Sequence, residues 1–422
     1  MALSGYVNTF LLLTALALHP VVASAEQPDL PSPTPIIFSA TPNNYSLLCN
    51  SQSLKITYIN KLKSLGKPGD QREEADIYCR LGDLENVTRN FEKAKDAYRE
   101  AGLRYKETDN LGLGRVWYGR GQMERKLNRY DDAEGAYEKA NHYYGLASSC
   151  QGQAAVQLAL GHVKRSTAKN FKDLKEVRRF YKKAKTLYQV EESRVGEANV
   201  LCALGDLECS LGNYEEARSS YEKAELLYKK MDNSLGLANV LTGQGDLERK
   251  LNKYEDAEKR YQEAEDKYED FEDPLGLANV LTGQGSKERK LDDYRSAEKF
   301  YEKALNQYRQ TNDRLGEANV LIEQGHLESR RDREKAQGLY NTAKEIYDQL
   351  EDKDKLGQAN VALGLGRLKA LQGELGSALT LYDKAEGLYR DIYNRPGLAD
   401  ALTGQGHLQG MQGKNDQARR AY

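Results

Sequence analysis

Residues 235–271 read LGLANVLTGQGDLERKLNKYEDAEKRYQEAEDKYEDF, and a nearly identical string begins again at Leu275. Copies aligned on their first glycine are spaced by 40, 44, 40, 40, 40, 41 and 40 residues, and a degenerate earlier copy begins near Glu73. The aligned glycines are Gly112, Gly152, Gly196, Gly236, Gly276, Gly316, Gly357 and Gly397. A period of this length predicts a solenoid, in which each unit buries its apolar face only against its neighbours.

Each copy divides into two segments with helical periodicity. In the first, Ala238, Leu241 and Gly245 recur at steps of three and four, which is the spacing of one helix face. In the second, small and aromatic residues recur at the same steps while Glu and Lys fill the other face. These residues are Tyr254, Ala257, Tyr261, Ala264 and Tyr268. The sequence therefore predicts a helix A and a helix B in every copy, joined by a short turn.

The copies resemble the tetratricopeptide repeat, whose consensus has a small residue in helix A and an Ala, aromatic, Ala series in helix B. Gly245, followed by Ala257, Tyr261 and Ala264, stands in that order. The copies are longer than the usual repeat of about 34 residues, and in this they are similar to rapsyn, cell-polarity adaptors and fungal or bacterial repeat proteins. The resemblance covers residues 73–422 and implies an all-α, right-handed α-solenoid of about nine helix-turn-helix repeats, the last one incomplete.

That resemblance implies a non-catalytic scaffold that binds a peptide or partner protein on the concave face formed by helix A. A regulatory or substrate-recruiting repeat array of a larger enzyme or signalling receptor is the alternative. The 62 basic and 64 acidic residues give a net charge of −2, which argues against a nucleic-acid partner. His162, His326 and His407 share one repeat phase and so fall on different units. The sequence predicts no enzyme, cofactor or metal site.

One helix A position is asparagine in five consecutive copies. The residues are Asn199, Asn239, Asn279, Asn319 and Asn360. Family geometry implies that they form a column on the concave face. Because an asparagine side chain offers both a donor and an acceptor, such a column can hydrogen-bond the backbone of an extended peptide. The alternative is that each asparagine satisfies a neighbouring helix or loop locally.

A basic row lies near the end of helix A. It comprises Arg249, Lys250, Arg289, Lys290 and Arg330. Guanidinium groups bind carboxylates in bidentate fashion, so the row predicts contact with an acidic peptide. An ion-pair lattice with the preceding acids, such as Glu248, is the alternative. Gln284 and Glu288 lie one turn apart where the family has apolar residues, and they predict a hydrogen-bonded seam or a wider spacing between the helices.

The N-terminal 72 residues differ from the array. Residues 1–25 carry an apolar run and a small-residue cleavage pattern, which predict a signal peptide and a secreted or secretory-pathway protein. Residues 26–44 form a Pro- and Ser-rich linker, and residues 45–72 predict a helical cap. The five cysteines are odd in number and show no disulfide framework, which favours a cytoplasmic location instead.

Two irregularities interrupt the repeat. Four extra residues between Gly161 and Tyr181 predict a longer loop between helices A and B of that copy. The last copy stops at Tyr422, within its expected helix B. An apolar face exposed there would either dock on a second copy of the chain or mark the chain as a fragment.

Overall fold

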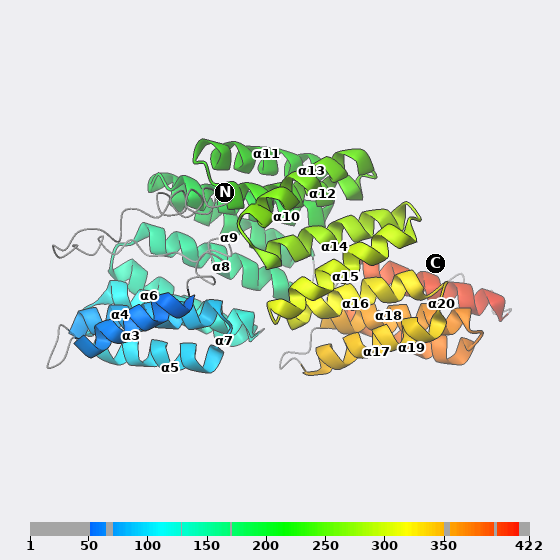
Figure 1. Cartoon of the computed structure of the whole chain (residues 1–422), viewed down its shortest axis with the longest axis horizontal. Coiled ribbons are helices and arrows are strands. Elements are labelled where there is room, and N and C mark those ends of the chain that lie inside the picture. Colours follow the sequence, from blue (N-terminus) through cyan, green and yellow to red (C-terminus); the bar gives the residue numbers. More distant parts are fainter. Residues whose placement is uncertain are drawn as a thin grey trace, which may run out of the picture. The chain divides into compact units, whose positions relative to one another are not determined.

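The computed structural model describes residues 51–64, 71–127, 129–168, 171–349, 355–391 and 395–412. These residues form 18 helices, α3 to α20, and no strand (Figure 1). Residues 1–44, with the predicted signal peptide and linker, lie outside the described part, and so do residues 413–422 at the predicted docking end. The all-α solenoid predicted from the period is confirmed.

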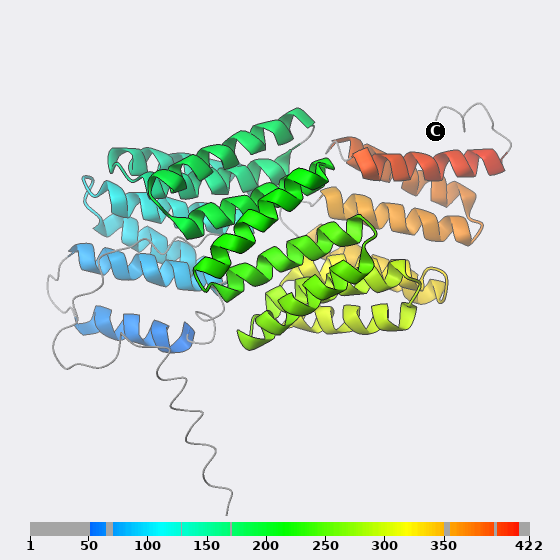
Figure 2. The ribbon, with the colours of Figure 1, turned by 90° about the horizontal axis from the view of Figure 1, so that it is seen from above.

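The A helices are α4 (Gln71–Val87), α6 (Asn110–Lys126), α8 (Cys150–Thr167), α10 (Arg194–Leu211), α12 (Ser234–Lys250), α14 (Pro274–Lys290), α16 (Arg314–Glu328), α18 (Lys355–Leu371) and α20 (Arg395–Met411). The B helices are α5 (Phe91–Arg104), α7 (Tyr130–Leu146), α9 (Phe171–Val190), α11 (Tyr214–Lys230), α13 (Tyr254–Asp270), α15 (Tyr294–Gln310), α17 (Arg333–Gln349) and α19 (Leu375–Asp391). Each A helix lies antiparallel to the B helix that follows it, and neighbouring pairs stack, as the colours in Figure 2 show.

Helix A begins at a recurring capping signal. The Asn233 side chain accepts a hydrogen bond from the Gly236 backbone N–H at 2.8 Å, and Asp313 does the same for Gly316 at 3.0 Å. These bonds satisfy donors that a helix start leaves unpaired. In five repeats the residue before the cap, such as Asp232, has a positive φ, here 54°, which turns the chain from one repeat into the next. The linking residues therefore help to set where these A helices start.

Tyrosines of helix B fill spaces left by glycines of helix A. Tyr261 is fully buried. A Cβ atom at Gly245 of the same repeat would lie 2.6 Å from its ring, and one at Gly283 of the next repeat would lie 2.8 Å from it. Because normal carbon contacts lie near 3.5–4.0 Å, only glycine fits at these two positions. The GxG strings of helix A are packing sites inside a helix and not phosphate-binding loops.

Polar pairs join one repeat to the next. Gln244 of α12 donates to Glu225 of α11 at 2.8 Å, and Gln284 of α14 donates to Glu265 of α13 at 2.9 Å. The predicted hydrogen-bonded seam is thus confirmed for the glutamines. The buried Glu248 carboxylate pairs with Arg218 of the preceding helix B and not with the basic row beside it.

The prediction of a longer loop between Gly161 and Tyr181 is wrong. Helix α8 ends at Thr167 and α9 begins at Phe171, so the connection has the same three residues as that between α12 and α13. The insertion lengthens the helices instead, because α9 gains nearly a turn at its N-terminus. Lys164 and Arg165 lie on α8, where they pair with Glu134 at 2.5 Å and Asp206 at 3.5 Å, respectively.

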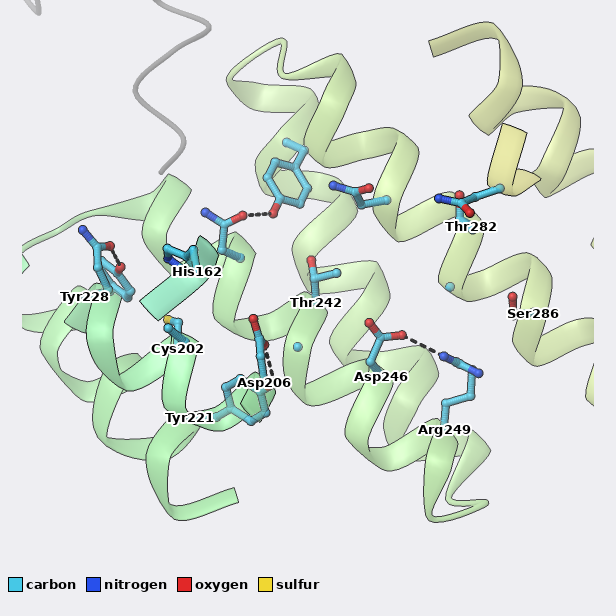
Figure 3. Close-up of a pocket in the computed structure, with 18 of the residues that line it drawn as sticks. His162, Cys202, Asp206, Tyr221, Tyr228, Thr242, Asp246, Arg249, Thr282 and Ser286 are labelled. Atoms are coloured by element: carbon cyan, nitrogen blue, oxygen red, sulfur yellow. Dashed lines mark hydrogen bonds and ion pairs between the residues drawn. The ribbon is translucent and has the colours of Figure 1, made fainter. Parts of the chain in front are cut away.

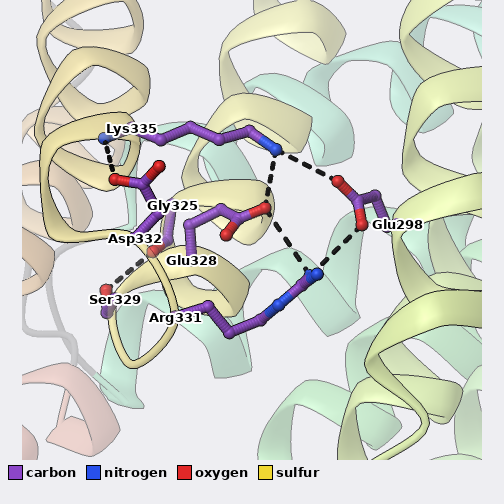
Figure 4. A network of polar contacts seen from close by, with 7 residues as sticks. All are labelled: Glu298, Gly325, Glu328, Ser329, Arg331, Asp332 and Lys335. Atoms are coloured by element: carbon purple, nitrogen blue, oxygen red, sulfur yellow. Dashed lines mark hydrogen bonds and ion pairs between the residues drawn. The ribbon is translucent and has the colours of Figure 1, made fainter.

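Ion pairs stabilise the turn between α16 and α17, at a place where the neighbouring repeats have a tyrosine. Lys335 bridges Glu298 at 3.0 Å and Glu328 at 2.7 Å, and Arg331 contacts Glu298 at 3.2 Å (Figure 4). Because Glu298 belongs to α15, this network ties the turn to the preceding repeat.

Helix α3 (Ser51–Ser64) lies in the segment predicted to cap the array. Its Tyr58 and Leu62 pack against the buried Ile77 and Leu81 of α4. It thereby covers apolar surface of the first described repeat, and its role as a cap stays a prediction.

Candidate functional site

A groove of about 500 Å³ runs across the A helices from α8 to α16 (Figure 3). Helices α10, α12 and α14 each contribute positions i, i+3 and i+7 to the lining, which fall on one helix face, whereas α8 contributes only the last two positions and α16 only the first. In α12 they are Asn239, Thr242 and Asp246. The groove therefore has three rows of side chains, which we call the Asn row, the Thr row and the Asp row.

The Asn row is anchored by the last tyrosine of helix B in the same repeat. Tyr268 donates to Asn239 Oδ1 at 2.7 Å, and Tyr308 donates to Asn279 Oδ1 at 2.6 Å. Tyr347 with Asn319 at 2.7 Å, Tyr389 with Asn360 at 2.6 Å, and Tyr228 with Asn199 repeat the same bond. Asn360 lies outside the groove lining, and the other four asparagines line it.

This bond fixes which atom of each amide faces the groove. Burial raises the pKa of Tyr308 to about 12, so its hydroxyl remains protonated and donates at neutral pH. The Thr282 hydroxyl beside it donates to the Ala278 carbonyl at 2.8 Å. The Tyr308 hydroxyl donates its own proton to Asn279. With Oδ1 occupied, the Nδ2 group of the exposed Asn279 has two protons for an acceptor in the groove.

The Asp row also binds tyrosine hydroxyls, here those of the central tyrosine of helix B. Tyr221 donates to Asp206 at 2.7 Å and Tyr261 donates to Asp246 at 2.8 Å. The row changes along the groove, with His162 in α8, Ser286 in α14 and, beyond the lining, His326 in α16. Burial lowers the pKa of His162 well below its usual value, so this imidazole is neutral at pH 7.

The structure shows the partners of two arginines in the basic row. Arg249 contacts Asp246 at 3.1 Å and Tyr261 at 3.2 Å, and Arg289 pairs with Glu323 of the next repeat at 3.0 Å. Carboxylates of the protein thus already pair with both arginines, and their contact with a partner stays a prediction. The remaining cations of the row are exposed. They are Lys250, Lys290 and Arg330. Only Arg249 of the whole row lies in the groove lining.

Sequence reasoning missed the Asp and Thr rows. Their signal was present, because Thr242 and Asp246 lie three and seven residues after Asn239 and so share its face. It also missed the tyrosine anchors, since Asn239 and Tyr268 are 29 residues apart and meet only when helices A and B pack.

Other kinds of site are absent from the described part of the chain. It contains no cluster of His, Cys, Asp or Glu able to hold a metal ion. None of its helices is long and apolar enough to cross a bilayer. Its four cysteines are free thiols. They are Cys79, Cys150, Cys202 and Cys209.

Repeated helix pairs of this kind, with a polar groove along the A helices, define a class of interaction proteins. Models of the tetratricopeptide repeat match residues 79–142, 196–270, 276–349 and 316–391. The chain belongs to the tetratricopeptide-repeat family. A comparison with curated protein sequences finds no match.

Solved structures of similar fold share little sequence with this chain. A Rap protein complexed with Competence and Sporulation Factor is 14% identical, with a TM-score of 0.53 over 82% of this chain and 99% of that one. The apo form of RapI is 15% identical, with a TM-score of 0.52 over 83% and 97%. Aspartyl phosphate phosphatase F from Bacillus subtilis is 14% identical, with a TM-score of 0.50 over 83% and 91%. At this identity the likeness shows the fold alone.

Proposed function

We propose that this chain binds an extended peptide, or an extended segment of a partner protein, in the groove between α8 and α16. The observation that carries the proposal is the orientation of the Asn row. Each tyrosine hydroxyl occupies the Oδ1 atom of its asparagine, so successive repeats present amide donors to the groove. Donors at repeated spacing suit backbone carbonyls, which every peptide carries whatever its side chains.

The dimensions suit a peptide of moderate length. Neighbouring helices pack about 8–10 Å apart, so the three intervals between the four asparagine-bearing A helices add to roughly 24–30 Å. An extended chain rises about 3.3 Å per residue, and about eight residues would therefore cross the groove. One structural neighbour, a Rap protein, is described as a complex with Competence and Sporulation Factor, which shows that this fold can hold a partner.

Binding can be tested with a displayed library of random peptides of about eight residues. Peptides selected on the full chain would be labelled, and their affinity measured by fluorescence anisotropy. Asn239→Ala combined with Asn279→Ala should weaken binding about 30-fold, because two hydrogen bonds of about 1 kcal/mol each are lost. Asn341→Ala, on the exposed face of α17, is the matched control and should leave binding unchanged.

Folding of each variant would be checked by circular dichroism. Selection of no peptide by the folded wild-type chain, or equal binding by the double variant and the control, would refute the proposal. The acidic-peptide prediction is judged by the same selection, since it requires enrichment of Asp and Glu. The alternative of a recruiting array within a larger enzyme or receptor also stays a prediction.

A further inference from the structure

The charged side chains of the groove are unevenly placed. Among the described residues that line it, Asp206 and Asp246 are the carboxylates and Arg249 is the one arginine or lysine. The Asp206 and Asp246 side chains are 47% and 44% exposed, whereas that of Arg249 is 23% exposed. The two carboxylates are therefore more accessible to a ligand in the groove than the Arg249 guanidinium is.

The two carboxylates come from adjacent A helices and approach the same space. Tyr221, which donates to Asp206, lies against Gly243 of α12, where a Cβ would be 3.1 Å from the tyrosine hydroxyl. Asp246 is three residues after Gly243 and so lies one helical turn further along the same face. Figure 3 shows Asp206 and Asp246 on neighbouring helices with Thr242 between them.

The arginines that pair with these acids lie on the outer sides of this space. Arg165 comes from α8 and approaches Asp206 at 3.5 Å, at the limit of a hydrogen bond. Arg249 follows Asp246 by one turn and bonds its Oδ1 atom, which also accepts from Tyr261. Oδ2 of Asp246 has no hydrogen-bond partner among the described residues. The acid pair can thus still accept a hydrogen bond from a ligand, at Oδ2 of Asp246.

Apart from Arg249, no arginine or lysine is among the described residues that line the groove. The same two helices contribute small residues to the lining, namely Cys202, Ala203, Thr242 and Gly243. One repeat further on, Ser286 of α14 replaces the second aspartate; two repeats further on, Glu323 of α16 replaces the glycine and pairs with Arg289. The open acid pair is therefore confined to α10 and α12.

We infer that Asp206 and Asp246 form a subsite for one cationic side chain, arginine or lysine, of the peptide bound in this groove. A planar guanidinium offers donors to both sides and suits two facing carboxylates better than an ammonium does. The inference rests on the proposed peptide binding and adds its specificity: the Asn row holds the backbone, and the acid pair selects a basic residue at one position. The predicted acidic partner is thereby disfavoured for this part of the groove.

The test extends the peptide selection. Peptides selected by the wild-type chain should share arginine or lysine at one position, and those selected by Asp206→Asn/Asp246→Asn should not. Asparagine keeps an oxygen that accepts from Tyr221 or Tyr261, so this variant should fold, which circular dichroism would verify. Asp266→Asn/Asp270→Asn on the exposed face of α13 makes the same charge change and should select as wild type does.

A selected peptide then gives the energetic test. Replacing its arginine with citrulline, a neutral isostere, should weaken anisotropy-measured binding to the wild-type chain about 10- to 100-fold. The same replacement should change binding to Asp206→Asn/Asp246→Asn by less than about 3-fold. Peptides that depend on the Asn row but show no basic position, or acidic ones, would overturn this subsite and leave peptide binding standing. Failure to select any peptide would overturn both.

Discussion

Replacing Gly245 with alanine tests how closely helices A and B must approach. Tyr261 is fully buried, and its ring lies between Gly245 and Gly283. A methyl group at Gly245 would lie 2.6 Å from the Cε1 atom and 2.7 Å from the Cδ1 atom of the ring. The ring has little room to retreat, because it also lies close to the Gly283 backbone, where a Cβ would be 2.8 Å from its Cζ atom, and because its hydroxyl is bonded to Asp246.

Two effects oppose each other in this variant. Alanine favours a helix over glycine by about 1 kcal/mol. Overpacking of a filled core costs about 1–3 kcal/mol. We expect the overpacking to prevail and Gly245→Ala to lower the free energy of unfolding by about 1–2 kcal/mol.

Gly338→Ala is the matched control. Gly338 lies within α17, and a Cβ there would meet nothing within 4 Å. This variant should gain about 0.5–1 kcal/mol from helix propensity alone. Urea denaturation followed by circular dichroism would compare the variants, and hydrogen exchange of α12 and α13 would locate the change, since solenoid repeats need not unfold together. Equal stabilisation by both alanines would refute the close-packing argument.

Two further predictions concern charge. Arg218→Met should lower the unfolding free energy by about 1–3 kcal/mol, since it leaves the buried Glu248 carboxylate without its partner. Lys344→Met, in the exposed pair with Asp348, should change it by less than about 0.5 kcal/mol, and equal thermal midpoints for the two variants would contradict this account. Burial lowers the pKa of His326 from 6.5 to about 4. The unfolded chain therefore binds a proton between these values that the folded one does not, and stability falls as pH drops through this window, by about 1–3 kcal/mol. Thermal midpoints measured from pH 4 to 7 should fall less steeply with decreasing pH for His326→Gln than for the wild-type chain. Parallel curves for the two proteins would contradict the lowered pKa of His326.

The candidate site was only partly readable from the sequence. Alignment of the copies identified the Asn row, because one helix A position is asparagine in five consecutive copies. The Asp row has the same phase, but the space between Asp206 and Asp246 depends on the small residues of two adjacent helices. The capture of Arg289 by Glu323 depends on how the repeats stack. The spacing of residues within one helix predicts neither the space between the two aspartates nor the Arg289–Glu323 pair.

The sequence by itself determined the repeat, its two helices, and the residues that stack one unit on the next, because each of these follows from local periodicity. Tertiary structure decided how the polar side chains are used. Tyr268 bonds the Asn239 amide across the helix pair, Asp246 pairs with Arg249 in the groove lining, and α9 absorbs an insertion that the repeat spacing assigns to a loop. A side chain's hydrogen-bond partner is set by which helices pack together, and a single helix's pattern gives its face but not its neighbour.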